Sequence, residues 1–552
     1  MDENKSHDQG IGLCMLSRRS FCDANEDLLV VGGRCIEHCM RLLDKLSNSK
    51  QRGDLALVVD RLDQVSNNLC SIIDYSGAVY RLHLDRRARD NALATVGKVS
   101  GLMAQLNGDI GLYKTLKKSL LANKDEQFLC KEGQKVGTSL LADFEDYGIN
   151  LSPGARKTFA KLQIDIQNIG HEFEDSLQEP LQSSMVSLSQ LVCRRAEAAK
   201  LLGHSSYAHL FLKDKVLTDP KNVLNFLNTF DKPQNSNIAE HPEVHSGLCF
   251  ESILKVLAYL SHNLFETKFV ANAEGLWGHD SVRLCFSSTL DDSPMGTVYF
   301  IISQRNSVTC HFPIRTWRMR PAENTVYGTN DVQTPICVVT VEVADKMNLS
   351  FSEIQSIFHE FGHALHTICA KTMFHHLSGT RCKLDFAEVP SNLMEIILQD
   401  SRIFSILAPT RKFVESHQRW VADIVCREDN NNSSQAQLAK FDQFVHGLSH
   451  RDCNSPEVFA HQVRHWCSKN TKSPTESFNL LNQVCKFRHL VSYGAGYYSY
   501  LFNQRIAKDI WKQYLDPNSP SYEPQRFLKD ALRYGGTRDT SDILDSLNIE
   551  ID

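Results

Sequence analysis

The sequence predicts a mainly α-helical protein with a small β-sheet in its second half. Apolar residues recur at i+3 and i+4 spacing through residues 25–185, through 193–230, and again from 352 to 552, as they do on the buried faces of packed helices. Two short runs rich in β-branched residues, 297–303 and 335–343, interrupt this pattern and predict strands. We therefore expect long helical regions before and after a sheet of few strands.

Changes in composition divide the chain of 552 residues. Residues 231–247 are polar and predict a loop, which separates a helical N-terminal lobe, 25–230, from the region 248–552. The Ser-rich run 181–192 predicts a connection between helices inside that lobe. We expect residues 1–24 to be a disordered N-terminal segment.

Composition and charge exclude several classes of protein. Hydrophobic residues are 42% and charged residues 23% of the chain, which is typical of a folded globular protein and excludes a collagenous or disordered one. The net charge of -5 predicts no nucleic-acid partner. No apolar run reaches the roughly 18 residues of a membrane span, so we expect no membrane insertion. The 17 cysteines are scattered and odd in number, which predicts reduced thiols.

A histidine pair on one predicted helix indicates metal chemistry. Ser350 and Glu353 form a capping-box pattern at the start of this helix. His359 and His363 stand at i and i+4, so both imidazoles project from one face, at a spacing that suits two nitrogen ligands of Zn²⁺. Glu360 is rotated by about 100° from His359, from where it can reach a water at the metal as a general base. The alternative is a helix with two surface histidines.

A catalytic zinc site needs a third protein ligand and an open position. Glu388 follows the histidines at a distance that a turn and a second helix can span, so it can face His359 and His363. Asp385 and Glu395 flank Glu388, and each is a candidate to accept the free N–H of a ligating histidine. The alternative is that all three acids are surface or helix-start charges.

Several segments resemble the thimet-oligopeptidase family of zinc metallopeptidases, and in particular its mitochondrial intermediate peptidase branch. They read His359-Glu-Phe-Gly-His-Ala-Leu-His, Gly379-Thr-Arg-Cys, Asp385-Phe-Ala-Glu-Val-Pro-Ser and Arg488-His-Leu-Val-Ser-Tyr-Gly-Ala-Gly-Tyr-Tyr-Ser-Tyr. The resemblance covers most of residues 25–552. It implies a two-lobed helical clamshell with a deep central channel and a small β-sheet beside the zinc helix, and it makes 248–552 the catalytic region.

The resemblance also implies the roles of the residues in the first motif. His359, His363 and Glu388 would hold one Zn²⁺ ion, and Glu360 would be the general base.

A second motif supplies candidate donors to the oxyanion that forms during peptide hydrolysis. The resemblance carries over His489, Tyr493, Tyr497 and Tyr500, and phenol O–H and imidazole N–H groups are suitable donors to such a charge. We expect catalytic roles for His489, Tyr497 and Tyr500 and a substrate-binding role for Tyr493.

The spacing of the three tyrosines also fits an aromatic core stripe, which is the alternative for this motif. Gly494 and Gly496 predict a mobile segment that could swing the tyrosines onto bound peptide. Tyr498 and Phe502 are better candidates for the core. The strand 335–343 precedes the active helix and is a candidate edge for pairing with a peptide substrate.

We predict a zinc-dependent endopeptidase that acts on peptides or unfolded precursor proteins, and we expect a monomer. The resemblance implies removal of an N-terminal octapeptide from imported precursors in the mitochondrial matrix. The acidic start, Met1–Lys5, is a poor transit peptide and favours a cytosolic oligopeptidase of the same family instead. A second alternative is a catalytically weak zinc-containing protein that binds peptides, although Glu360 argues against it.

Overall fold

The structure is a computed structural model of the whole chain. It describes residues 28–48, 55–122, 130–231, 245–303, 309–319, 332–400, 402 and 411–550. The predicted disordered segment 1–24 and most of the predicted loop 231–247 lie outside the described residues.

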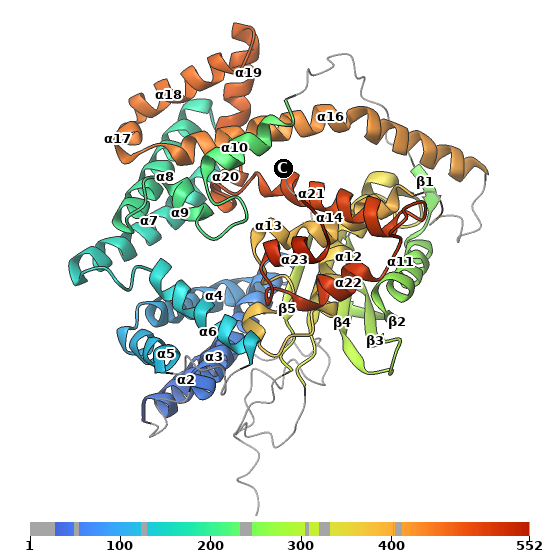
Figure 1. Cartoon of the computed structure of the whole chain (residues 1–552), viewed down its shortest axis with the longest axis horizontal. Coiled ribbons are helices and arrows are strands. Elements are labelled where there is room, and N and C mark those ends of the chain that lie inside the picture. The colour runs from blue at the N-terminus through green and yellow to red at the C-terminus, as the bar shows by residue number, and fades with distance from the viewer. Residues whose placement is uncertain are drawn as a thin grey trace, which may run out of the picture.

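Helices form the first part of the chain, as predicted (Figure 1). One group has its own apolar core, and its helices are α2 (Leu28–Asn48), α3 (Leu55–Leu82), α4 (Arg86–Asn107), α5 (Ile110–Ala122) and α6 (Lys131–Asp146). A second group comprises α7 (Pro153–Ser176), α8 (Leu181–Leu201), α9 (Tyr207–Leu212) and α10 (Pro220–Asn228). Ser152 and Asp219 cap α7 and α10, each just before a proline at the helix start.

The prediction of a connection at 181–192 is wrong, because these residues form the first half of α8. Met185, Leu188 and Val192 are buried on this helix against a core that residues much later in the chain complete. Ser184 and Ser189 are buried as well, and the Ser184 hydroxyl donates to the carbonyl of Ser176 at 3.0 Å. Tertiary burial therefore outweighs the weak helix propensity of a Ser-rich run.

A five-stranded mixed sheet lies in the middle of the chain and confirms the two predicted strands. Its strands are β2 (Thr267–Leu276), β3 (His279–Ser288), β4 (Pro294–Ser303), β5 (Cys310–Arg315) and β6 (Ile336–Glu342). The order is β2-β3-β4-β6-β5, and only the β4–β6 pair is parallel. The proposed edge at 335–343 is wrong, because β6 pairs with β4 and with β5, which leaves β5 as an edge strand.

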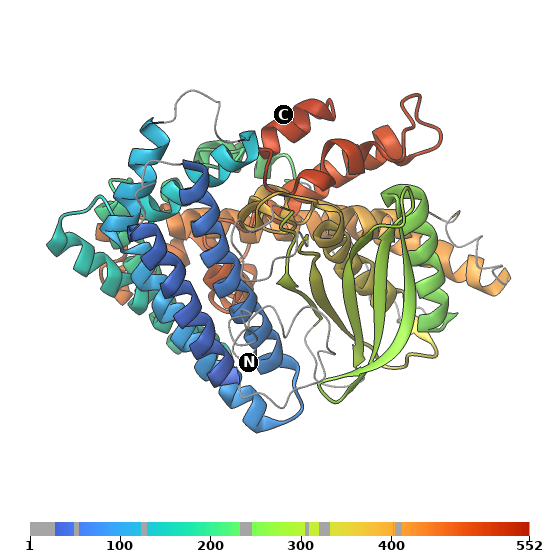
Figure 2. The ribbon, with the colours of Figure 1, turned by 90° about the horizontal axis from the view of Figure 1, so that it is seen from below.

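Helices cover both faces of the sheet (Figure 2). Tyr299 and Ile301 of β4 face α3, whereas Phe300 between them faces the core around the later helix α12 (Phe351–Cys369). The helix α11 (Phe250–Phe265) belongs to that second core. Because both faces of β4 and β6 are buried, the sequences of these strands are nearly continuous apolar runs.

The remaining helices complete the core around α12 and a further core on α8. The short strand β1 (His245–Leu248) pairs with β7 (Leu349–Ser350). After β7 the described chain is helical, and its elements are α12, η1 (His375–Leu377), α13 (Leu384–Ala387), α14 (Val389–Leu398), α16 (Arg411–Gly447), α17 (His450–Cys453), α18 (Pro456–Lys469), α19 (Pro474–Cys485), α20 (His489–Ser492), α21 (Ser499–Ile510), η2 (Trp511–Leu515), α22 (Arg526–Asp530), η3 (Leu532–Tyr534) and α23 (Thr540–Ser546). Helices α17–α19 pack on α8 rather than on the sheet. The predicted boundary at 231–247 thus divides the sequence but not this core, and the division into domains stays a prediction.

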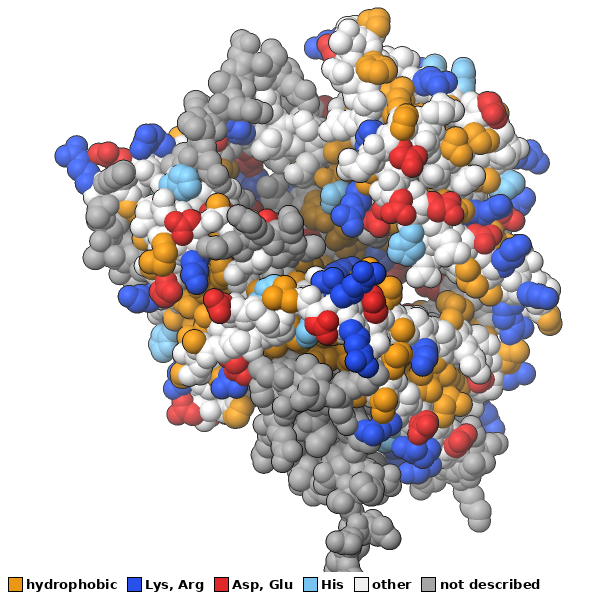
Figure 3. Space-filling view, turned by 180° about the vertical axis from the view of Figure 1, so that it is seen from behind, with side chains coloured by type: hydrophobic (Ala, Val, Ile, Leu, Met, Phe, Trp, Pro, Cys, Tyr) orange, Lys and Arg blue, Asp and Glu red, His pale blue; other side chains and the backbone are white. Residues whose placement is uncertain are grey.

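The architecture is the predicted two-lobed helical clamshell. The long helix α16 runs from one lobe to the other (Figure 1). The space-filling view shows the molecule hollowed between the lobes (Figure 3). Every cysteine among the described residues is a free thiol, as expected. No helix within the described ranges is long and apolar enough to span a membrane.

The crossing of α12 and α14 generates the first prediction. A Cβ atom at Gly362 would lie 2.6 Å from Cα of Ser391 and 2.7 Å from the carbonyl oxygen of Pro390, and neither backbone atom can move alone. We expect Gly362→Ala to destabilise the protein by about 1–3 kcal/mol, as overpacking does, and to lower the melting temperature. Gly97→Ala on α4 is the matched control, because nothing lies within 4 Å of its Cβ. Equal melting temperatures for the two variants would contradict this account of the crossing.

Candidate metal centre

Helix α12 carries the predicted histidine pair and begins where the capping box predicts. The Ser350 hydroxyl accepts from the backbone N–H of Glu353 at 3.3 Å, and the Glu353 carboxylate accepts from the N–H of Ser350 at 2.7 Å. Its apolar face is fully buried. The rings of His359 and His363 lie side by side, with centroids 5.0 Å apart.

Glu388 meets both histidines from the junction of α13 and α14. Its Oε2 lies 3.1 Å from Nε2 of His363 and 3.5 Å from Nε2 of His359. The Ser391 hydroxyl donates to the same oxygen at 3.0 Å and fixes its position. Burial raises the pKa of Glu388, but the hydrogen bond to His363 and the charges of both histidines lower it to about 2. Glu388 is therefore an anion at neutral pH.

The donor set of this group fits a zinc ion. The ligand atoms of His359, His363 and Glu388 all lie within 4.8 Å of one another, close enough for one ion to contact all three. Two imidazole nitrogens and one carboxylate oxygen are a donor set of catalytic zinc sites, which leave a further position open to water or substrate.

Glu395 holds one of the two histidines. Nδ1 of His359 donates to Oε1 of Glu395 at 2.5 Å, which leaves Nε2 of His359 free to face Glu388. The amide of Gln355 donates to the other oxygen of Glu395 at 2.5 Å. Burial lowers the pKa of His359, but the hydrogen bond to Glu395 and the charges of Glu395, Glu388 and Glu360 raise it to about 9. The carboxylates thus make this site attractive to a cation.

The structure places Asp385 away from the ligating histidines that it was predicted to contact. Its buried carboxylate accepts from the backbone N–H of Val216 at 2.7 Å and from the hydroxyl of Thr540 at 2.8 Å. It therefore ties α13 to the segment before α10 and to the start of α23. Sequence proximity to Glu388 misleads here because successive residues of a short helix point in different directions.

Glu360 stands beside the metal group, with only 8% of its surface exposed. Burial raises the pKa of its carboxyl above the ordinary value, whereas the positive charges of His363 and His359 lower it. A carboxyl with a raised pKa is a better proton acceptor than an exposed one, as a general base requires.

The four residues of the second motif come together as one aromatic cluster. The His489 ring lies 5.9 Å from Tyr493, 5.2 Å from Tyr497 and 6.0 Å from Tyr500, measured between centroids. Burial raises the pKa of Tyr493 and of Tyr500, and the negative charge of Glu388 contributes to both shifts. The cluster thus lies within electrostatic reach of the metal group.

The neighbouring aromatic residues and glycines have packing roles. Tyr498 and Phe502 are buried in the core, as expected. A Cβ at Gly494 would collide with Arg195, and one at Gly496 would lie 2.7 Å from Phe211. The expected mobility of this segment stays a prediction. Both glycines permit close contact with these side chains.

His311 is a residue of the site that the sequence did not indicate. It lies on β5, and its ring stacks on His363 with centroids 5.8 Å apart. Its Nε2 lies 3.2 Å from the hydroxyl of Thr367. Burial, together with the charge of His363, lowers its pKa well below the ordinary value, so the ring is neutral. The sequence neighbours of His311 include no second candidate ligand at helical spacing, so no pattern in the sequence places this residue in a metal site.

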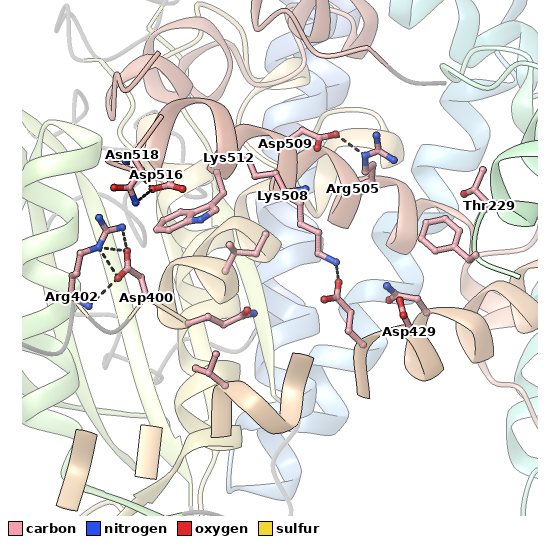
Figure 4. Close-up of a pocket in the computed structure, with 17 residues that line it drawn as sticks. Thr229, Asp400, Arg402, Asp429, Arg505, Lys508, Asp509, Lys512, Asp516 and Asn518 are labelled. Atoms are coloured by element: carbon pink, nitrogen blue, oxygen red, sulfur yellow. Dashed lines mark hydrogen bonds and ion pairs between the residues drawn. The ribbon is translucent and has the colours of Figure 1, made fainter. Parts of the chain in front are cut away.

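A cavity of about 1120 Å³ lies apart from this site, among α14, α16, α21 and η2 (Figure 4). Ion pairs join many of its charged side chains, namely Arg402 with Asp400, Lys508 with Glu428 and Arg505 with Asp509. None of the metal-group residues lines it. We assign it no part in the chemistry.

Comparisons with known proteins agree with the geometry. Residues 309–552 match the model of peptidase family M3. The mitochondrial intermediate peptidase of Coprinopsis cinerea is 24% identical over an alignment of 647 positions, gaps included, which covers 91% of this chain and 82% of the relative. The human mitochondrial intermediate peptidase is 24% identical over 588, covering 86% and 80%.

Solved structures share the fold across most of the chain. PZ peptidase A with an inhibitor has a TM-score of 0.58 at 12% identity and covers 94% of this chain and 93% of its own. A carboxypeptidase of Pyrococcus furiosus has a TM-score of 0.54 at 12% identity, with 92% and 97% covered. These findings confirm the predicted resemblance to this group of metallopeptidases.

Proposed function

We propose that the chain is a zinc-dependent endopeptidase that cleaves unfolded peptides. The observation that carries this proposal is the convergence of His359, His363 and Glu388 within 4.8 Å beside the buried Glu360. These three residues would hold the zinc ion. When bound, zinc supplies a Lewis acid that polarises the scissile carbonyl and lowers the pKa of water.

Glu360 moves the proton in the proposed reaction. Its carboxylate takes a proton from the attacking water and delivers it to the nitrogen of the leaving amine. The scissile C–N bond breaks as the new C–O bond is completed. Burial suits Glu360 to this task because the charge of its carboxylate is poorly solvated and readily accepts a proton.

The aromatic cluster stabilises the oxyanion. Tyr497 or Tyr500, with His489, donates a hydrogen bond to the carbonyl oxygen as negative charge develops on it. Tyr493 contacts the substrate. The pKa of all three phenols is raised, so each keeps the proton that a hydrogen-bond donor needs.

The substrate is a flexible chain that can enter the hollow between the lobes (Figure 3). An extended peptide can pair with β5, an edge strand that carries His311. The relatives are named mitochondrial intermediate peptidases, which favours imported precursor proteins as substrates, loss of an N-terminal octapeptide and a location in the matrix. The cytosolic oligopeptidase and the weak peptide-binding protein are the two alternatives.

Glu360→Gln tests the general base. We expect kcat to fall by about 10²- to 10⁴-fold, because the amide cannot accept the proton of water, while bound zinc per chain is unchanged. The measurement is mass spectrometry of the products from a precursor-like peptide, with and without a chelator.

Three outcomes separate the candidate functions. Loss of one N-terminal octapeptide, abolished by the variant and by the chelator, supports precursor processing. Scattered cuts in short peptides with the same sensitivity favour the cytosolic oligopeptidase. A folded, zinc-loaded wild-type chain that cleaves nothing contradicts the enzyme and leaves the peptide-binding protein.

Glu395→Gln tests the support of the metal site. Replacing the carboxylate weakens the acceptor that orients His359, so we expect zinc affinity to fall about 10- to 100-fold. Asp385→Asn is the matched control, because the contacts of this buried acid are with Val216 and Thr540, and it should keep the zinc affinity of the wild type. Competition with a chromophoric chelator measures both. Equal affinities for the two variants would show that Glu395 does not support the site.

A further inference from the structure

A fully buried carboxylate on α16 holds the backbone of the second motif. Oδ1 of Asp442 accepts from the N–H of Ala495 at 2.9 Å, and Oδ2 accepts from the N–H of Tyr497 at 3.0 Å. The neighbouring Gln443 donates from Nε2 to the carbonyl oxygen of Ala495 at 2.7 Å. Ala495 has a φ of 64°, a conformation that disfavours a residue with a side chain, so these contacts stabilise a strained turn.

A buried arginine from the N-terminal half of the chain completes the arrangement. Arg195 on α8 donates from Nη1 to the carbonyl of Leu490 and from Nη2 to the carbonyl of Val491, both at 2.6 Å. Its Nη1 also donates to Nε2 of His446 at 2.9 Å. Nδ1 of His446 in turn donates to Oδ1 of Asp442 at 2.8 Å. The guanidinium of Arg195 and the carboxylate of Asp442 are thus joined through the imidazole of His446.

These contacts surround the segment that carries the proposed oxyanion donors. Arg195 holds the end of α20, which begins with His489, and Asp442 holds the residues that follow it. One of the two backbone N–H groups that donate to Asp442 belongs to Tyr497. Tyr500 lies in the first turn of the next helix, α21. The direction of both phenols therefore depends on the conformation of this turn.

We propose that Asp442 is a positioning residue for the hydrolytic reaction, and that it sets the place of the Tyr497 and Tyr500 hydroxyls relative to the metal group. Arg195 and His446 orient its carboxylate. Asp442 does not touch the substrate, so its effect on the reaction passes through the tyrosines. This inference rests on the proposed function.

The first measurement compares two buried carboxylates. In Asp442→Asn an NH2 group replaces one carboxylate oxygen and cannot accept from the backbone N–H that faces it, so the turn shifts. A displacement of about 1 Å near the reacting atoms can lower a rate by about 100-fold. We expect kcat for peptide hydrolysis by the zinc-loaded protein to fall about 10- to 100-fold, with KM changed less than about threefold.

Asp63→Asn is the matched control for that variant. Asp63 on α3 is also fully buried and accepts from Arg318 and from the N–H groups of His375 and His376, far along the chain from the tyrosine segment. Both variants should lower the melting temperature. Only Asp442→Asn should lower kcat, so loss of stability alone does not explain the effect.

A double-mutant cycle separates positioning from a general loss of structure. Tyr497→Phe and Tyr500→Phe are measured first, and the one with the lower kcat is combined with Asp442→Asn. If Asp442 acts through that tyrosine, the double variant loses at most about threefold beyond the tyrosine variant alone, because the group that was positioned is already gone.

Several results overturn the inference. These are an unchanged kcat in Asp442→Asn, an effect on KM alone, an equal loss of kcat in Asp63→Asn, or fully additive losses in the cycle.

If Asp442→Asn does not fold, Gln443→Met takes its place in the same measurements, because it removes only the hydrogen bond to Ala495 and keeps the side-chain size. Additive losses in an active enzyme overturn this inference alone, whereas a zinc-loaded wild type that cleaves no peptide overturns the proposed function and this inference together.

Discussion

The close crossing of α12 and α14 is the constraint on which the site depends. One helix carries both histidines, and the other begins at Glu388, the proposed third ligand. Gly362 lets the backbone of Pro390 and Ser391 approach α12 closely, which brings the carboxylate of Glu388 toward the histidines. The sheet and the C-terminal helices pack around this crossing and fix its geometry from outside.

Burial and charge then give each acid near the crossing a separate role. Glu388 is held as an anion by the two histidines, whereas the pKa of Glu360 is raised by burial. Glu395 accepts from His359, and Asp385 holds backbone segments together at some distance from the chemistry. Four carboxyl groups in a short stretch of chain thus differ in function because their neighbours differ.

The sequence was sufficient for the parts of the structure that depend on local pattern. The helix from Ser350, the strands β4 and β6, and the facing of Glu388 toward the histidines follow from spacing and side-chain chemistry. The helix at 181–192, the position of β6 inside the sheet and the contacts of Asp385 do not, because each depends on residues far away in the chain. Asp442 is the clearest case, since nothing near it in the sequence marks a residue that binds a turn some 50 positions later.

The core around α8 has a consequence for how the chain is made. Met185, Leu188 and Val192 are covered by α17–α19 and by residues near Leu490, so their partners are synthesised about 300 residues later. During translation this apolar face of α8 emerges well before anything native can cover it. The nascent N-terminal lobe therefore exposes a hydrophobic surface for most of synthesis, as a binding site for chaperones and a point where aggregation can begin.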